Sequence, residues 1–174
     1  MDFLDSYMRG MAEFAQANAA YAVPIVFLVA FAECTAFLSF LVPATVFFAV
    51  FGAAAGASGL SPLPLALAAT AGAGLGFWVS YWIGLVLGPR AHEFWPFRKN
   101  PEMLTRGHAF FEKWGAPGVF VGHFVGPVRA VIAIAAGIAR MPPLPFHLAN
   151  WTASTVWGFL FFYGGGLVGQ YLAR

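Results

Sequence analysis

The stretch Gly118–Arg140, GVFVGHFVGPVRAVIAIAAGIAR, sets one arginine, Arg129, in an apolar run that Gly126 and Pro127 interrupt. A guanidinium at the centre of a membrane costs about 2.5–3.5 kcal/mol on insertion scales, so it is seldom found there without a function. A broken helix at membrane depth is tolerated only where it is buried in protein or lines a wet cavity. We therefore expect residues 115–140 to form two half-helices that enter and leave on the same side, with Arg129 handling an anion.

The composition of the 174-residue chain is that of an integral membrane protein. Hydrophobic residues make up 60% of it and charged residues 9%, against about 25% charged residues in soluble domains, and the mean hydropathy is +0.76. The spans are expected to be helical, because the alternating pattern of an outer-membrane barrel is absent. A net charge of +2 without a long basic cluster predicts no nucleic-acid partner.

The whole chain is interpreted as a single membrane domain, residues 1–174, that contains two related halves. The first apolar run, residues 21–57, exceeds one span of about 20 residues and is broken by Pro43. Clear spans are expected at residues 65–88 and 146–171. The segments are an amphipathic N-terminal helix at 1–18, a first repeat at 21–88, a polar linker with an interfacial helix at 89–114, and a second repeat at 115–172. No cleavable signal peptide is expected, since residues 1–18 are acidic rather than basic.

An internal repeat relates residues 62–88 to residues 143–169. An offset of 81 aligns them without a gap and gives seven identities in 27 positions, including Pro-Leu-Pro at both starts. Upstream, residues 42–45 are paired with residues 126–129. If each Pro-broken segment re-enters, the single span after it changes side and the two repeats are inverted, as in many secondary transporters. The predicted fold is an all-α polytopic membrane protein with this inverted repeat, and the basic residues of the linker favour its cytoplasmic placement.

The polar residues of the broken segments form the predicted site. Glu33 and Arg129 are one ionisable residue from each repeat, so Glu33 is either a structural counter-ion for Arg129 or a proton-coupling group. His123 is either a group that titrates near neutral pH or a packed ring. Arg129 favours planar bidentate partners such as phosphate, or else locks the two re-entrant segments together. Asn150 is a predicted hydrogen-bond partner for broken backbone.

The sequence gives no sign of an enzyme active site. A nucleophile with its base, paired carboxylates and a phosphate-binding loop are all absent. His92 and His108 lie 16 residues apart without supporting ligands, so we expect no metal site. Cys34 is interpreted as a small apolar packing residue. The chain is therefore predicted to be a non-enzyme without a cofactor.

These residues resemble the DedA family, also called SNARE-associated or VTT-domain proteins, from about Phe31 to Trp157. The motifs that carry the resemblance are AECTAFLSFLVPAT, GAGLGFWVSYWIGLVLG and the long stretch from Phe111 to Trp157, which includes Arg129. The departures are at positions that are charged in the family. This chain has Thr45, Phe77, Leu85 and His123 there. The missing acid at Thr45 leaves the family's proton dependence open for this chain, although Thr45 is kept as a candidate site residue.

The resemblance implies movement of a lipid across the bilayer, either undecaprenyl phosphate or a phospholipid, in the cytoplasmic membrane of a bacterium. The expected substrate-binding residues are Arg129, Glu33, His123, Asn150 and Thr45, with Pro43, Gly126 and Pro127 breaking the helices. The expected partners are membrane lipids, among them an anionic phosphate-bearing lipid, and protons. Two alternatives stay open, a proton-coupled transporter of a small solute or ion and a structural membrane protein that supports envelope homeostasis. Gly-x-x-x-Gly spacings permit a homo-oligomer.

Overall fold

A computed structural model describes residues 6, 10, 19–35, 45–57, 60–93, 98–99 and 101–172, and their regular structure is helical. In chain order, the helices are α2 (Ala19–Cys34), α3 (Thr45–Ala57), α4 (Pro62–Leu87), the 3-10 helix η2 (Gly88–Glu93), α5 (Glu102–Gly122), α6 (Gly126–Ile138), α7 (Pro143–Phe159), the π-helix η3 (Leu160–Gly164) and α8 (Gly165–Leu172). The all-α class expected from the composition is confirmed. The predicted helix at 1–18 and the helix-breaking Pro43 lie outside the described residues, except for Ser6 and Gly10.

The long helix α4 supplies the axis of the fold. It starts with Pro62 after the extended residue Ser61, because proline is already set for the first turn and needs no hydrogen bond there. Its 26 residues give a length of about 39 Å, enough to cross a hydrocarbon core of about 30 Å. Among the described residues it is the one helix that alone is long and apolar enough to span a membrane. The predicted span at 65–88 thus begins three residues earlier.

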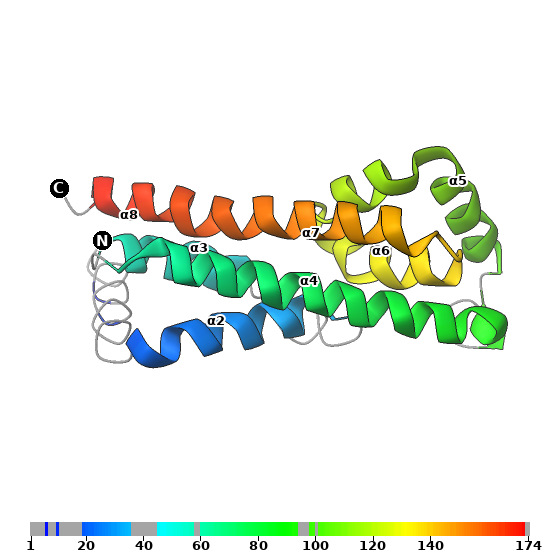
Figure 1. The fold of residues 1–174 in the computed structure, drawn as a ribbon, viewed down its shortest axis with the longest axis horizontal. Coiled ribbons are helices and arrows are strands. Elements are labelled where there is room, and N and C mark those ends of the chain that lie inside the picture. The colour runs from blue at the N-terminus through cyan, green and yellow to red at the C-terminus, as the bar shows by residue number, and fades with distance from the viewer. Residues whose placement is uncertain are drawn as a thin grey trace.

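The last helix is a continuous rod made of α7, η3 and α8. The capping residues Leu160 and Gly165 keep right-handed helical backbone angles, so the π-helical turn widens the helix without ending it. Figure 1 shows this rod running opposite to α4. The predicted span at 146–171 falls within it.

Small residues let the short helices approach the two long ones. A Cβ on Gly84 would collide with the carbonyl of Ile134, and one on Gly137 with the carbonyl of Tyr81, so α6 packs backbone to backbone on α4. In the same way Gly56 of α3 lies against Gly166 of α8. Each short helix therefore packs on the long helix of the other half through the kind of small-residue contact that holds helices together in membranes.

The helix bounds follow the 81-residue offset of the internal repeat. Adding 81 to the ends of α3, Thr45 and Ala57, gives the ends of α6, and Pro62 becomes Pro143, the start of α7. The predicted pairing of residues 42–45 with 126–129 needs an offset of 84 instead. On the helix bounds, the counterpart of Arg129 is Phe48, whereas Thr45 corresponds to Gly126.

The helix break in the second half falls slightly before its predicted position. Helix α5 continues past Trp114 to Gly122 with a kink at Gly115, where φ is 47° and ψ is −131°. The break itself is the turn at residues 123–125, and Gly126 and Pro127 begin α6. Proline is tolerated in the first turn because the amide it lacks would have no intrahelical partner. Two helices separated by a turn are therefore observed, but the break precedes Gly126-Pro127.

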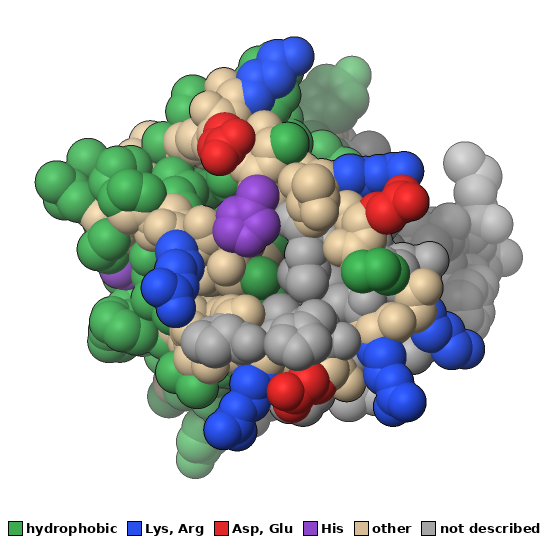
Figure 2. All heavy atoms as spheres, turned by 90° about the vertical axis from the view of Figure 1, so that its right-hand side faces the viewer, with side chains coloured by type: hydrophobic (Ala, Val, Ile, Leu, Met, Phe, Trp, Pro, Cys, Tyr) green, Lys and Arg blue, Asp and Glu red, His purple; other side chains and the backbone are tan. Residues whose placement is uncertain are grey.

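The surface separates into an apolar flank and a charged end. Large side chains on the long helices are exposed, for example Val86 at 76% and Leu167 at 69%, as expected where lipid surrounds them. Figure 2 shows Lys, Arg, Asp and Glu side chains gathered over the end of the molecule that carries α5. The exposed basic residues of η2, the linker, α5 and the end of α6 are Arg90, Arg98, Lys99, Arg106, Lys113 and Arg140.

Candidate functional site

An ion pair between Arg129 and Glu33 is buried in the contact between α2 and α6. Arg129 is in the first turn of α6, where its backbone amide donates to the carbonyl of Val125 at 2.8 Å. Glu33 is the penultimate residue of α2. The Arg129 Nη2 donates to Glu33 Oε2 at 3.1 Å, and the two side chains are only 7% and 8% exposed. The sequence left two roles open for Glu33, and this distance is the one that the counter-ion role requires.

Two further groups surround the guanidinium of Arg129. Its Nη2 also donates to the sulfur of Cys34 at 3.0 Å, and its Cζ lies 4.3 Å from the centroid of the Trp157 ring. The end of α2 lies next to Ser80 of α4, whose hydroxyl donates to the carbonyl of Gly76 at 2.8 Å and lies 3.4 Å from the carbonyl of Cys34. The arginine is therefore fixed by α2 on one side and by α7 on another.

The burial of this pair makes its integrity energetically important. Two desolvated charges need each other, and removing one partner of a buried pair costs about 3–5 kcal/mol because the other charge stays uncompensated. A cation over an indole ring adds about 2 kcal/mol when both are desolvated. The buried Nε–H of Arg129 has no acceptor among the described residues.

His123 lies at the C-terminal end of α5, where its backbone amide donates to the carbonyl of Val119 at 3.1 Å. The side chain is fully buried. Its ring lies 4.4 Å from the ring of Phe77 and 6.2 Å from that of Trp157, centroid to centroid. Neither ring nitrogen has a hydrogen-bond partner among the described residues. His123 and Arg129 thus share one neighbour, Trp157.

The other predicted site residues lie apart from the ion pair or are only partly described. Asn150 is fully buried in α7 and donates to the carbonyl of Gly74, in the middle of α4, at 2.9 Å. Its own oxygen accepts from Ser154 at 3.3 Å. It therefore joins two unbroken helices instead of satisfying a broken one. Thr45 begins α3, and its side chain is outside the described part of the chain.

Three side chains that surround the site were not predicted as part of it: Trp157, Ser80 and Phe77, of which Phe77 was named only as a departure from the family pattern. One signal was available for Trp157, because it follows Asn150 by seven residues and positions i and i+7 share a helix face. Phe77 and Ser80 lie in a helix of uniformly apolar character, in which periodicity does not mark an inner face. Their contacts come from the way α2, α5 and α7 meet around α4.

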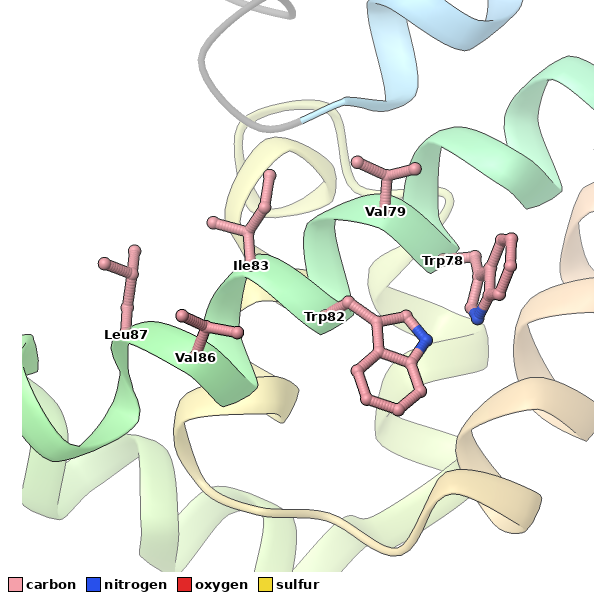
Figure 3. A pocket seen from close by; sticks show the side chains of 6 residues that line it. All are labelled: Trp78, Val79, Trp82, Ile83, Val86 and Leu87. Carbon is pink, nitrogen blue, oxygen red and sulfur yellow. The ribbon is translucent and has the colours of Figure 1, made fainter.

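A groove of about 540 Å³ lies away from this site, on the outer face of α4. Its lining side chains are all on that helix, as Figure 3 shows: Trp78, Val79, Trp82, Ile83, Val86 and Leu87. All are apolar, and neither Arg129 nor Glu33 is among them. The groove is therefore part of the apolar flank and carries none of the charged chemistry.

The helical fold, the apolar flank and the buried ion pair define an integral helical membrane protein with a polar centre. Comparison with known proteins identifies the family, because the VTT domain model matches residues 42–167 of the chain. The chain belongs to the VTT-domain family, the DedA family of the sequence resemblance.

Several bacterial membrane proteins are similar to the chain. It is 31% identical to the inner membrane protein YabI of Escherichia coli over 149 residues, which cover 86% of this chain and 59% of YabI. It is 37% identical to the undecaprenyl phosphate transporter A of Bacillus subtilis over 98 residues, 52% of this chain and 46% of that protein. The protein of the same name in Staphylococcus aureus is 29% identical over 126 residues, 68% of this chain and 62% of that protein.

The match covers 86% of this chain but only 58–59% of the length of two of the curated relatives. No solved structure matches it. The names of the relatives confirm the inner membrane as the location.

Proposed function

We propose that the chain is a membrane transporter that moves a phosphorylated lipid across the inner membrane, with Arg129 binding the phosphate. The observation that carries the proposal is the placement of Arg129, buried where α2, α6 and α7 meet, with its Nε donor unpaired among the described residues. An arginine at membrane depth is expected to serve an anion or an ion pair. Here the buried Nε–H has no acceptor among the described residues after the ion pair is made.

The architecture of the two halves supports a transport site at this position. Each half has a short helix, α3 or α6, followed by a long one, and the long helices run in opposite directions. We interpret the halves as inverted repeats whose short helices are re-entrant. In transporters built in this way, substrate binds near the midplane where broken helices from the two repeats meet, and the Glu33–Arg129 pair joins the two halves.

Related proteins support the choice of lipid phosphate as the substrate. Two of the similar proteins are named undecaprenyl phosphate transporter A, and an arginine has the donor geometry that suits phosphate oxygens. In our proposal Glu33 neutralises the guanidinium while the site is empty, a role supported by the 3.1 Å pair. His123, against the same tryptophan, lines the edge of the site. Asn150 stabilises the contact of α7 with α4.

The test is lipid movement in vesicles that contain the purified protein. Undecaprenyl phosphate is placed in one leaflet, and the accessibility of its phosphate from the other side is followed in time. We expect the wild-type chain to equilibrate the lipid, and Arg129→Ala to reduce the protein-dependent rate to the background of empty vesicles. Arg106→Ala is the matched control, because Arg106 is an exposed arginine paired with Glu102, and it should retain the wild-type rate.

Removing Arg129 alone leaves Glu33 buried without its main partner, so the variant risks misfolding. The double change Glu33→Gln with Arg129→Gln keeps two hydrogen-bonding side chains of similar size and removes both charges. A folded double variant that still moves the lipid at the wild-type rate would contradict the proposed role. A second vesicle series with phosphatidylglycerol separates the phosphate monoester from a phosphodiester as substrate.

One observation favours a second candidate, a structural membrane protein. Arg129 is only 6% exposed, and its guanidinium ties α6 to the end of α2, as a structural lock would. Under this candidate, wild-type vesicles move no lipid, while Arg129→Ala lowers the unfolding temperature. The vesicle assay with the purified wild-type chain therefore separates the two functions.

A further inference from the structure

Trp157 occupies the junction between the ion pair and the aromatic core. Its side chain is 3% exposed, and the guanidinium carbon of Arg129 lies 4.3 Å from its ring centroid. The ring of Phe48, from α3, meets it at 4.9 Å and 79°. Trp157 of α7 thus contacts α6 and α3, the two short helices that correspond to each other in the repeat.

A tryptophan face stabilises a cation in a way that a carboxylate does not. The attraction comes from the electron density of the ring, so it lowers the free energy of the buried charge without accepting a hydrogen bond. A bidentate carboxylate would accept from two of the guanidinium N–H groups. Around Arg129, Glu33 and Cys34 both accept from Nη2, and Nε stays without a partner in the described part of the chain.

We propose that Trp157 is the positioning residue of the site. Its ring holds the Arg129 guanidinium in the apolar interior with the Nε–H free for a phosphate oxygen of the transported lipid. This inference rests on the proposed function and adds to it the group that keeps the arginine ready to bind. The competing explanation is that the indole only fills volume between α3, α6 and α7.

Fluorinated tryptophans introduced at position 157 alone distinguish the two explanations. Each added fluorine withdraws electron density from the ring face and weakens its attraction for a cation, while the shape of the ring changes little. The series is 5-fluoro-, 5,7-difluoro- and 4,5,6,7-tetrafluorotryptophan. We measure the mole fraction of undecaprenyl phosphate that gives half-maximal transport in vesicles. We expect it to rise stepwise, by roughly tenfold or more at the end of the series, with a smaller change in maximal rate.

Trp151 provides the matched control on the same helix. Its ring lies against Gly74 and is 40% exposed, and it has no cation over its ring among the described contacts. The same fluorinated residues at position 151 should leave the half-maximal mole fraction unchanged. A flat response at position 157, or equal responses at both positions, would overturn the inference. The half-maximal mole fraction for Trp157→Phe should lie between the values for wild type and Trp157→Leu, since the phenylalanine ring attracts a cation more weakly than the indole does.

A second readout does not depend on transport. In the wild-type background, fluorination at Trp157 should lower the unfolding temperature in detergent. In the Glu33→Gln, Arg129→Gln background it should have no such effect, because the cation is gone. An equal shift in both backgrounds would show that the ring acts by volume alone and would overturn the inference. The two readouts can also differ. If wild-type vesicles move no lipid, but fluorination lowers the unfolding temperature only when Arg129 is present, the proposed function is refuted and the stabilising contact of Trp157 with Arg129 is supported.

Discussion

At the scale of single residues, the molecule depends most on the pairing of Arg129 with Glu33. The two side chains belong to segments 96 positions apart, so the pair is made only when both halves have folded around each other. Because the charges are buried, the pair contributes little by itself compared with an apolar pair of the same size, whereas breaking it is costly. It therefore specifies the arrangement of α2 and α6.

A double-mutant cycle on stability tests this dependence. Glu33→Gln should lower the free energy of unfolding by about 3–5 kcal/mol, because it leaves a buried guanidinium without its counter-ion. The double change Glu33→Gln with Arg129→Gln should recover most of that loss. Chemical denaturation in detergent micelles gives the free energies. Equal destabilisation by the single and double changes would mean that charge compensation is not what holds the two segments together.

The exposed pair of Arg106 with Glu102 is the control for that cycle. Its atoms approach to 3.0 Å, yet the side chains are 81% and 78% exposed, so water and salt screen the interaction. Glu102→Gln should leave the unfolding free energy nearly unchanged. The comparison isolates burial, since the two pairs have almost the same N–O separation.

At the scale of elements, the contact of α6 with α4 depends on two glycines, Gly84 and Gly137. A Cβ on Gly137 would meet the backbone of Tyr81 and Gly84, and backbone cannot move aside as a side chain can. Gly137→Ala should therefore separate the helices and lower the unfolding free energy by about 1–3 kcal/mol, the usual cost of overpacking. Gly107→Ala is the control, because a Cβ there meets nothing within 4 Å and alanine favours the helix. Equal stability of the two variants, measured by thermal unfolding, would contradict this account.

The kink in α5 makes a separate prediction about backbone conformation. Gly115 has a φ of 47°, and a Cβ at this position also meets nothing within 4 Å. Gly115→Ala should lower the unfolding temperature through conformational strain alone, since alanine disfavours this region of backbone angles. Gly107→Ala is the control, because it adds the same methyl group into equally open space and differs only in the backbone conformation of the site. If both variants unfold at the same temperature, the kink is not fixed by glycine.

Some elements were predictable from the sequence, and others depended on tertiary contacts. The long helix α4 and the continuous helix α7–α8 followed from long apolar runs that open with proline. The break in the second half was expected at Gly126-Pro127, but proline starts helices as readily as it breaks them, so those residues begin α6 and the turn precedes them. Glu33 and Arg129 were identified because charges are rare in such runs. Trp157 was not, since an aromatic residue in an apolar helix carries no signal of its partner.

At the scale of the whole molecule, charged side chains gather at one end, and the long helices present an apolar flank. The linker and α5 form the charged end, and α8 ends at the opposite side of the molecule (Figure 1). If α4 crosses the bilayer, these ends lie on opposite sides, and we expect the α5 end to face the cytoplasm because of its Lys and Arg residues.

Cysteine labelling in intact cells tests this orientation. The chain has a single cysteine, Cys34, which is 2% exposed and should not react. His108→Cys and Tyr171→Cys introduce cysteines at positions that are exposed at the two ends. A membrane-impermeant maleimide added outside should label position 171 but not 108, and should label both after permeabilisation. Labelling of both from outside would contradict the orientation.

The central claim is that the charge of Arg129, where the two halves meet, binds the phosphate of a lipid that the protein moves across the membrane. The most direct measurement is the rate at which undecaprenyl phosphate crosses vesicles containing the folded variant with Glu33→Gln and Arg129→Gln, relative to wild type. Because the variant carries no buried unpaired charge, its unfolding temperature serves to show that the fold is retained. We predict that vesicles with the wild-type protein equilibrate the lipid, and that vesicles with the variant show only the background rate. Equal rates for a folded variant and wild type would contradict the claim.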